Sequence, residues 1–333
     1  MVGVPVVGDA VDENDEAFRL NLSGAVNATI ADGQGIGAIV DDDTALISVG
    51  DAVIAEGDAG TANATFTVSL DTPSTKTVTV HAATADGTAV SPVDYSSTSI
   101  DLSFSPGQTS KTADVPVAGD TLDEADETFS ITLSSPANAL LGDAQGEGTI
   151  TDDDAAPALS ANDPTVTEGD SGSTSMTFTV TLGGPSGKTV TVHYATADGS
   201  AQAPADYESA TGDLTFTPGM TSRPVTVVVG TDTVLEPDET LTLSLSLPVN
   251  AVIADGSGLG TISNDDTVPA ISIDDVAVTE GTGGTNTAEF TLTLTGASAL
   301  PASVDWTTAD GAASAGEDYE RSEERRVGKE CRL

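Results

Sequence analysis

Carboxylates that return at fixed intervals are the residues with the clearest chemical potential in this chain. Three consecutive aspartates at 41–43 recur at 152–154 and, with Asn264 in the first place, at 264–266. The intervals are 111 and then 112 residues. Clustered loop carboxylates suit a hard cation, because calcium takes about six to eight oxygen ligands from carboxylates and carbonyls. The pattern therefore indicates repeated calcium sites.

Two further signals share this period. An acidic segment precedes each triplet, at residues 8–16, 119–127 and 231–239. A Glu-Gly pair recurs at Glu56, Glu168 and Glu280. A fixed period means that each repeat is one folding unit, and this period is long enough for a whole small domain.

The repeats divide the chain into five segments. We expect the second part of a repeat at 1–43, complete repeats at 44–154 and 155–266, the first part of a repeat at 267–320, and a foreign tail at 321–333. Little chain separates one repeat from the next, so neighbouring domains should touch end to end. Because the chain starts and stops within repeats, the missing signal peptide carries little weight.

Alternating apolar and polar residues predict strands. In the 155–266 repeat such runs occur near Val166 and at 177–182, 189–194, 214–216, 225–229, 241–247 and around Ile262. About seven short strands in about 110 residues, bounded by Gly, Pro, Asp or Asn, are typical of an antiparallel β-sandwich of immunoglobulin type. The predicted fold class is therefore all-β, with tandem sandwiches and few helices.

Within the 44–154 repeat, this strand order would bring three acidic segments to one end of the sandwich. The candidates are Glu56, Asp94, Asp120, Glu124, Glu127, Asp152, Asp153 and Asp154. So many carboxylates would repel one another strongly without a cation. The alternative is a solvated acidic surface, as in halophile proteins. An EF-hand is disfavoured, since no such loop with flanking helices occurs.

The overall charge restricts the classes of partner. The chain has 53 acidic and 10 basic residues and a formal net charge of -43. Nucleic-acid binding is disfavoured because phosphate contacts need Lys and Arg. No run approaches 18 apolar residues, so no membrane span is expected. Such self-repulsion should be neutralised by divalent cations or by high salt.

The last 13 residues, 321–333, do not follow the repeat pattern. They hold five of the ten basic residues and the single cysteine, Cys331. The segment resembles the in-frame translation of a common sequencing adapter, and we exclude it from fold reasoning. The remaining chain has no cysteine, so neither a disulfide nor thiol chemistry is expected.

Taken in order, the repeated motifs resemble the Calx-beta domain. In the first complete repeat they read Glu56-Gly57, Thr84-Ala85-Asp86-Gly87-Thr88-Ala89, Asp94-Tyr95, Phe104-Ser105-Pro106-Gly107, the acidic segment 120–127 and the triplet 152–154. The family is known from sodium/calcium exchangers, integrin β4 and large bacterial surface proteins. The resemblance covers residues 1–320 and implies calcium bound at the end of each domain.

Matching positions extend the candidate ligands to every repeat. The second complete repeat adds Glu168, Asp206, Asp232, Glu236, Glu239, Asp265 and Asp266. The partial repeats add Asp9, Glu13, Glu16, Asp41, Asp42, Asp43, Glu280 and Asp318. Two departures predict fewer or weaker ions: the calcium-rich family pattern has a further Asp where Gly119 and Thr231 stand, and Asn264 replaces an Asp. The 155–266 site should therefore be the weaker of the two.

The leading hypothesis is a fragment of a large secreted or cell-surface protein whose calcium-stiffened repeats space or present adhesive domains. Its expected partners are calcium ions, neighbouring repeats and an unknown surface or matrix ligand. The alternatives are a calcium-sensing regulatory module, a non-catalytic appendage of a truncated extracellular enzyme, and a halophilic rod without specific ion sites. No catalytic motif occurs, so no enzyme is expected. His81 and His193 are interpreted as outward strand positions.

Overall fold

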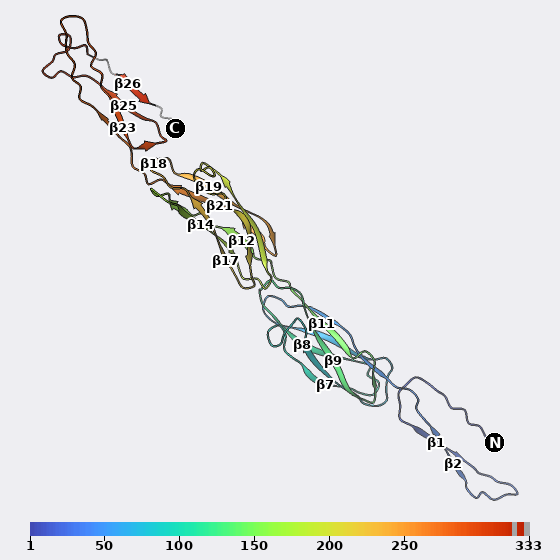
Figure 1. The fold of residues 1–333 in the computed structure, drawn as a ribbon. Coiled ribbons are helices and arrows are strands. Elements are labelled where there is room, and N and C mark those ends of the chain that lie inside the picture. The colour runs from blue at the N-terminus through green and yellow to red at the C-terminus, as the bar shows by residue number, and fades with distance from the viewer. Residues whose placement is uncertain (322–324, 330–333) are drawn as a thin grey trace. The chain divides into compact units, whose positions relative to one another are not determined.

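The structure, a computed structural model, describes residues 1–321 and the backbone of residues 325–329. All regular elements in these ranges are strands, without any helix. The chain divides into two compact units, Met1–Ala155 and Ala156–Leu333. Each unit holds one pair of larger sheets and smaller pieces of sheet (Figure 1).

The repeat in the first unit is a sandwich of two sheets. One sheet has the order β10-β3-β5-β8 and the other the order β4-β11-β9-β6-β7. The bounds are β3 Leu46–Val49, β4 Ala52–Ala55, β5 Gly60–Leu70, β6 Val78–Asp86, β7 Ser99–Phe104, β8 Ser110–Gly119, β9 Glu127–Ala137, β10 Leu140–Leu141 and β11 Gln145–Thr151. Most neighbours are antiparallel, but β4 and β11 run parallel, from Ala52 beside Gly148 to Ala55 beside Thr151.

The core of this repeat lies between its two sheets, where alternate residues in the middle of the longer strands are buried. Three aromatic rings form its centre. Phe66 meets Phe129 edge to face at a centroid distance of 5.8 Å, and Tyr95 stacks on Phe129 at 4.5 Å. Such pairs stabilise beyond the area that they bury. The core holds the strand ends, and hence the acidic loops, in place.

The second unit repeats this architecture, with sheet orders β17-β14-β12-β20 and β13-β21-β19-β15-β16. Its strands are β12 Ala158–Ala161, β13 Thr165–Thr167, β14 Thr174–Leu182, β15 Val190–Asp198, β16 Thr211–Phe216, β17 Ser222–Val229, β19 Glu239–Val249, β20 Val252–Asp255 and β21 Ser257–Ser263. Again the short entering strand β13 runs parallel to β21. A separate core contains Phe178, Phe216 and Tyr207.

The partial repeats form smaller pieces of sheet. At the N-terminal side β1 (Glu16–Asn21) pairs with β2 (Gln34–Ile39). In the second unit β22 (Ala270–Ile273) pairs with β23 (Leu292–Thr295), and β18 (Val234–Leu235) runs parallel to β24 (Ala297–Ser298). Strand β25 (Ala302–Trp306) pairs with β26 (Arg325–Lys329).

The predicted all-β sandwich is confirmed, and each complete repeat has more strands than the seven expected. The first strand is split between the two sheets, as β3 and β4, because the chain crosses over at Gly50. A further short strand, β10 or β20, joins each sheet edge. The foreign origin of residues 321–333 stays a prediction, and Cys331 lies outside the described residues.

Candidate metal centre

Parallel pairing of β4 with β11 brings the first two acidic segments together. Glu56 directly follows β4, and the aspartates 152–154 directly follow β11, so both leave the same edge of the sheet. The Gly57 amide donates to Asp153 Oδ1 at 3.0 Å, and the Glu56 amide donates to the Thr151 carbonyl at 3.2 Å. We call this end of the sandwich the acidic tip.

One three-carboxylate group lies at this tip. Ligand oxygens of Glu56, Asp152 and Asp154 all lie within 4.8 Å of one another. Glu56 is only 9% exposed, although it is an acidic side chain at the end of a strand. Close carboxylates with little access to water are costly unless a cation or protons neutralise them.

The loop between β8 and β9 supplies the third acidic segment. The Glu124 amide donates to Asp152 Oδ1 at 3.1 Å, which fastens the loop to the triplet. The Asp152 amide in turn donates to Asp126 Oδ1 at 3.1 Å. Asp120 accepts the Leu122 amide at 2.7 Å and so shapes the start of the loop. Asp126 therefore positions the site, and it was absent from the sequence-based set.

Asp94 reaches the tip from the loop between β6 and β7. Its Oδ2 accepts the Val90 amide at 2.6 Å, and its carbonyl accepts the Ala118 amide at 2.9 Å. The next residue, Tyr95, is buried, and its hydroxyl donates to Asp86 Oδ1 at 2.6 Å. The Tyr95–Asp86 hydrogen bond closes this loop, so it holds Asp94 in place.

Burial and the close approach of carboxylates raise the pKa of several groups at the tip. Burial, followed by the charges of Asp120, Glu124 and other acidic neighbours, raises the pKa of Glu56 to about 7. Burial and the neighbouring Asp94 raise the pKa of Glu127 to about 7. Negative charge therefore gathers at two places, one around Glu56 and one between Glu127 and Asp94.

The second complete repeat builds an equivalent tip. Three groups have ligand oxygens within 4.8 Å: Glu168 with Asp232 and Glu236, Asp206 with Glu236 and Glu239, and Asp170 with Asp265 and Asp266. A small pocket opens among Glu168, Asp206, Glu236, Glu239 and Asn264. Burial and nearby carboxylates raise the pKa of Glu168 and that of Glu239 to about 7. The acid-rich geometry thus recurs with the sequence period.

Orphaned oxygens at both tips fit a bound cation. Asp154 Oδ2 and Asp266 Oδ2 stand at equivalent positions, and both are buried without a hydrogen-bond partner in the described part of the chain. The Thr231 hydroxyl is in the same condition. Buried polar atoms nearly always have a partner. A hard cation coordinated by carboxylate oxygens would satisfy these atoms and the charge of their neighbours.

The partial repeats assemble less of a site. Asp41 Oδ2 accepts the Glu13 amide at 3.1 Å. Desolvation raises the pKa of Asp43, and so, to a smaller extent, do the nearby charges of Asp42, Asp41, Asp9 and Asp12. Among described residues, however, no three-carboxylate group includes Asp9, Glu13, Glu16, Asp41, Asp42, Asp43, Glu280 or Asp318. Glu280 and Asp318 are exposed.

Besides Asp126, the structure places two further carboxylates at the tips that are not among the sequence-predicted ligands. Asp170 lies in one group with Asp265 and Asp266. Asp58 is at the equivalent position of the first complete repeat. Desolvation, the charge of Asp152 and then the charge of Asp58 raise the pKa of Asp154. The signal was present, because Glu-Gly-Asp recurs at 56–58 and 168–170. The aspartate of this motif therefore marks the added carboxylate in both repeats.

The two histidines lie apart from this chemistry. The ring Nδ1 of His81 is 2.8 Å from Asp101 Oδ1, and that of His193 is 2.8 Å from Asp213 Oδ1. Both rings sit on sheet faces and are about a third exposed, at 36%.

The repeats define a family. The Calx-beta domain matches residues 41–155, 152–257 and 263–325, and the chain therefore belongs to the Calx-beta domain family. This confirms the resemblance drawn from the motifs. Domains of this family are binding and regulatory domains.

The chain is similar to one extracellular matrix protein in sequence and to solved calcium-binding domain structures in fold. The chain is 29% identical over 289 residues to "Extracellular matrix protein 3" of Lytechinus variegatus, a match that takes in 81% of this chain and 9% of that protein. The crystal structure of CBD12 from CALX1.2 is 19% identical, covers 65% of this chain and 99% of its own, and has a TM-score of 0.32. The calcium binding domain CBD12 of CALX1.1 is 24% identical, over 61% of this chain and 79% of its own, with a TM-score of 0.32.

No helix in the described part of the chain is long and apolar enough to cross a membrane.

Proposed function

We propose that this chain is a calcium-binding module of tandem repeats within a larger extracellular protein. The observation that carries the proposal is the orphaned, buried Oδ2 of Asp154 inside a group of close carboxylates, repeated at Asp266. A calcium ion supplies positive charge and accepts many oxygen ligands in a flexible geometry. The residues present therefore match the chemistry of that ion.

Each acidic tip would hold its ion with residues from separate elements. Glu56 or Glu168 anchors the end of the entering strand. The triplets 152–154 and 264–266 anchor the end of the leaving strand, and Asp120, Glu124 and Glu127, or Asp232, Glu236 and Glu239, anchor the loop between. Asp94 or Asp206 completes the donor set, with Asp153 and Asp265 at the rim. Binding would remove the repulsion and fix these elements to one another.

The first partial repeat is proposed to carry the same chemistry at Asp9, Glu13, Glu16, Asp41, Asp42 and Asp43, and the last at Glu280 and Asp318. Each of these sets comes from only part of a repeat. We therefore expect weaker calcium binding there than at the complete tips.

A spacer role on the outside of the cell is the favoured biological setting. The relative named as an extracellular matrix protein supports it, and so does the scarcity of linker between repeats. In this proposal the chain has no catalytic role. It would stiffen on binding calcium and present further domains or a matrix ligand. A calcium-sensing module is the second candidate, supported by membership of a family that includes regulatory domains.

Titration calorimetry on the whole chain, with thermal unfolding in calcium or in chelator, tests the binding. A ligand that binds only the folded state must raise the unfolding temperature. We expect heat of binding and a higher melting temperature in calcium. Absence of both would reduce the tips to solvated acidic surface and would favour the halophilic alternative.

Small-angle scattering with calcium and with chelator separates the two roles. A spacer should become stiffer and more extended as calcium binds. A sensor should show a discrete change of shape over a narrow range of calcium concentration. Profiles that are identical with and without calcium, from a chain shown to bind it, would contradict both.

A further inference from the structure

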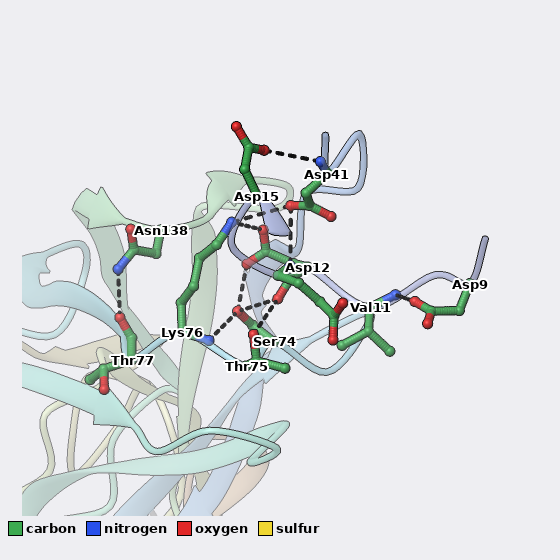
Figure 2. A network of polar contacts seen from close by, with 11 residues as sticks. Asp9, Val11, Asp12, Asp15, Asp41, Ser74, Thr75, Lys76, Thr77 and Asn138 are labelled. Atoms are coloured by element: carbon green, nitrogen blue, oxygen red, sulfur yellow. Dashed lines mark hydrogen bonds and ion pairs between the residues drawn. The ribbon is translucent and has the colours of Figure 1, made fainter. Parts of the chain in front are cut away.

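A buried carboxylate joins the first partial repeat to the complete repeat that follows it. Asp12 is 3% exposed, and its Oδ2 accepts the hydroxyl of Ser74, itself 2% exposed, at 2.5 Å. The Thr75 amide donates to the Asp12 carbonyl at 2.9 Å. Figure 2 shows Asp12 among these residues, which belong to the segment between β5 and β6.

Lys76 supplies the charge that this carboxylate needs. Its Nζ lies 2.8 Å from Asp12 Oδ1 and 3.2 Å from Asp41 Oδ2, so one ammonium group bridges two carboxylates of the preceding repeat (Figure 2). The ammonium group holds the pKa of Asp12 below its ordinary value, although burial alone would raise it. The three residues form one ionic cluster between two repeats.

The same backbone contact occurs in the second unit with different side chains. The Ala299 amide donates to the Leu235 carbonyl at 3.0 Å, and the Leu300 amide donates to the Ser298 hydroxyl at 3.0 Å. These bonds correspond to those of Thr75 with Asp12 and of Lys76 with Ser74, where the latter is also 3.0 Å. We call such a contact between one repeat and the next a joint. The same backbone hydrogen bonds therefore occur at two joints.

All three charges of the cluster change together between the two joints. By repeat position, Asp12 corresponds to Leu235, Asp41 to Asn264 and Lys76 to Leu300. At the intermediate position the sequence keeps all three charged types, as Asp123, Asp152 and Lys188. Losing only the lysine would leave two carboxylates unpaired, and losing only the carboxylates would leave a lysine unpaired. Neither mixed combination occurs.

We propose that these three positions are a matching set that determines which repeat can follow which. A charged tip, Asp12 with Asp41, fits a following repeat that carries Ser74 and Lys76. A neutral tip, Leu235 with Asn264, fits a following repeat with Leu300. Mismatched pairs are disfavoured. Without the lysine, Asp12 would stay buried with no positive charge beside it, and a lysine placed on a neutral tip would gain no ionic partner. Asn264 then belongs to the joint, whether or not it also weakens an ion site.

Amide hydrogen exchange on the full chain, in chelator, tests this independently of calcium. The reporters are the Thr75 amide for the charged joint and the Ala299 amide for the neutral one. Lys76→Leu creates a mismatch and should lower the protection of Thr75 about tenfold or more, the size expected for losing hydrogen bonds to a charged group. The triple variant D12L/D41N/K76L copies the neutral joint and should restore most of that protection.

Controls separate the joint from the fold. Lys111→Leu removes the same charge from strand β8 and should leave Thr75 unchanged. Amides of β5 report whether the repeat itself stays folded. Equal Thr75 protection in the parent and in Lys76→Leu, or no recovery in the triple variant, would overturn the proposal.

Discussion

Individual carboxylates at the acidic tips are harder to ionise than a carboxylate that is exposed to water. Glu56, Glu127, Glu168 and Glu239 all have a pKa of about 7, where 4.5 is ordinary, because burial and like charges oppose ionisation. Protons and calcium therefore compete for the same oxygens. Both the calcium affinity and the stability of the chain should depend on pH.

The pH dependence of stability has a definite sign. Since these four groups have folded pKa values above the ordinary 4.5, the folded state binds more protons than the unfolded state between about pH 4.5 and 7. Their contribution to stability is fully present below that window and is lost as the pH rises through it. In chelator, the melting temperature should thus be higher at about pH 6 than at about pH 8. A melting temperature that rises with pH over this range would contradict the assignment.

Asp154 distinguishes a binding role from a structural one. Asp154→Asn removes one charge from the cluster, so in chelator the variant should be equally stable or more stable than the parent. In calcium it should bind about tenfold more weakly, because an amide brings no charge to the ion. Calorimetry and thermal unfolding measure both effects. Asp114→Asn, which alters an exposed carboxylate in the middle of β8, is the matched control and should change neither.

Elements explain why the sequence predicted the tip but not all of its members. The alternation of apolar residues fixes strands such as β14 and β19, and the repeat period fixes which acidic segments are equivalent. The split of the entering strand into β3 and β4 has no periodic signature, since each half has four residues. The pairing of Tyr95 with Asp86 depends on a loop conformation, which the Asp-Tyr motif alone does not reveal.

Strand ends also determine where another ligand could be added. A Cβ at Gly119 would lie 2.1 Å from the Gly57 carbonyl oxygen and 2.6 Å from that of Glu56, so no side chain fits there without a backbone shift. The equivalent Thr231 already carries a side chain whose hydroxyl is buried and unpartnered. The family's additional Asp is therefore sterically excluded from the first complete repeat only.

This contrast predicts opposite results for one substitution at two equivalent positions. Gly119→Asp should lower the melting temperature in chelator and in calcium, by the few degrees or more that a backbone clash causes. Thr231→Asp should destabilise in chelator and strengthen calcium binding about tenfold, since it adds a charged ligand. Calorimetry and thermal unfolding of each variant measure this. Equal behaviour of the two variants would show that the local backbone does not control ion number.

For the whole molecule, the strand architecture and family follow from the sequence, whereas the joints do not. A net charge of -43 predicts only that counterions are needed. It does not reveal that Asp12 forms an ion pair with Lys76, because the two residues are 64 positions apart and lie in different repeats. Contacts between repeats become predictable from sequence only when Leu235, Asn264 and Leu300 are compared with their charged counterparts.

The parallel pairing of β4 with β11 has a mechanical consequence. A pulling force on the two ends of the 44–154 repeat would draw these adjacent strands in opposite directions along their length, so their hydrogen bonds would bear the load together. A calcium ion joining Glu56 to Asp152 and Asp154 would reinforce the same pair. In single-molecule force spectroscopy, unfolding forces should be higher in calcium than in chelator, since forced unfolding follows the unfolding rate. Such a repeat would act as a tension-bearing link whose strength is set by the calcium around it.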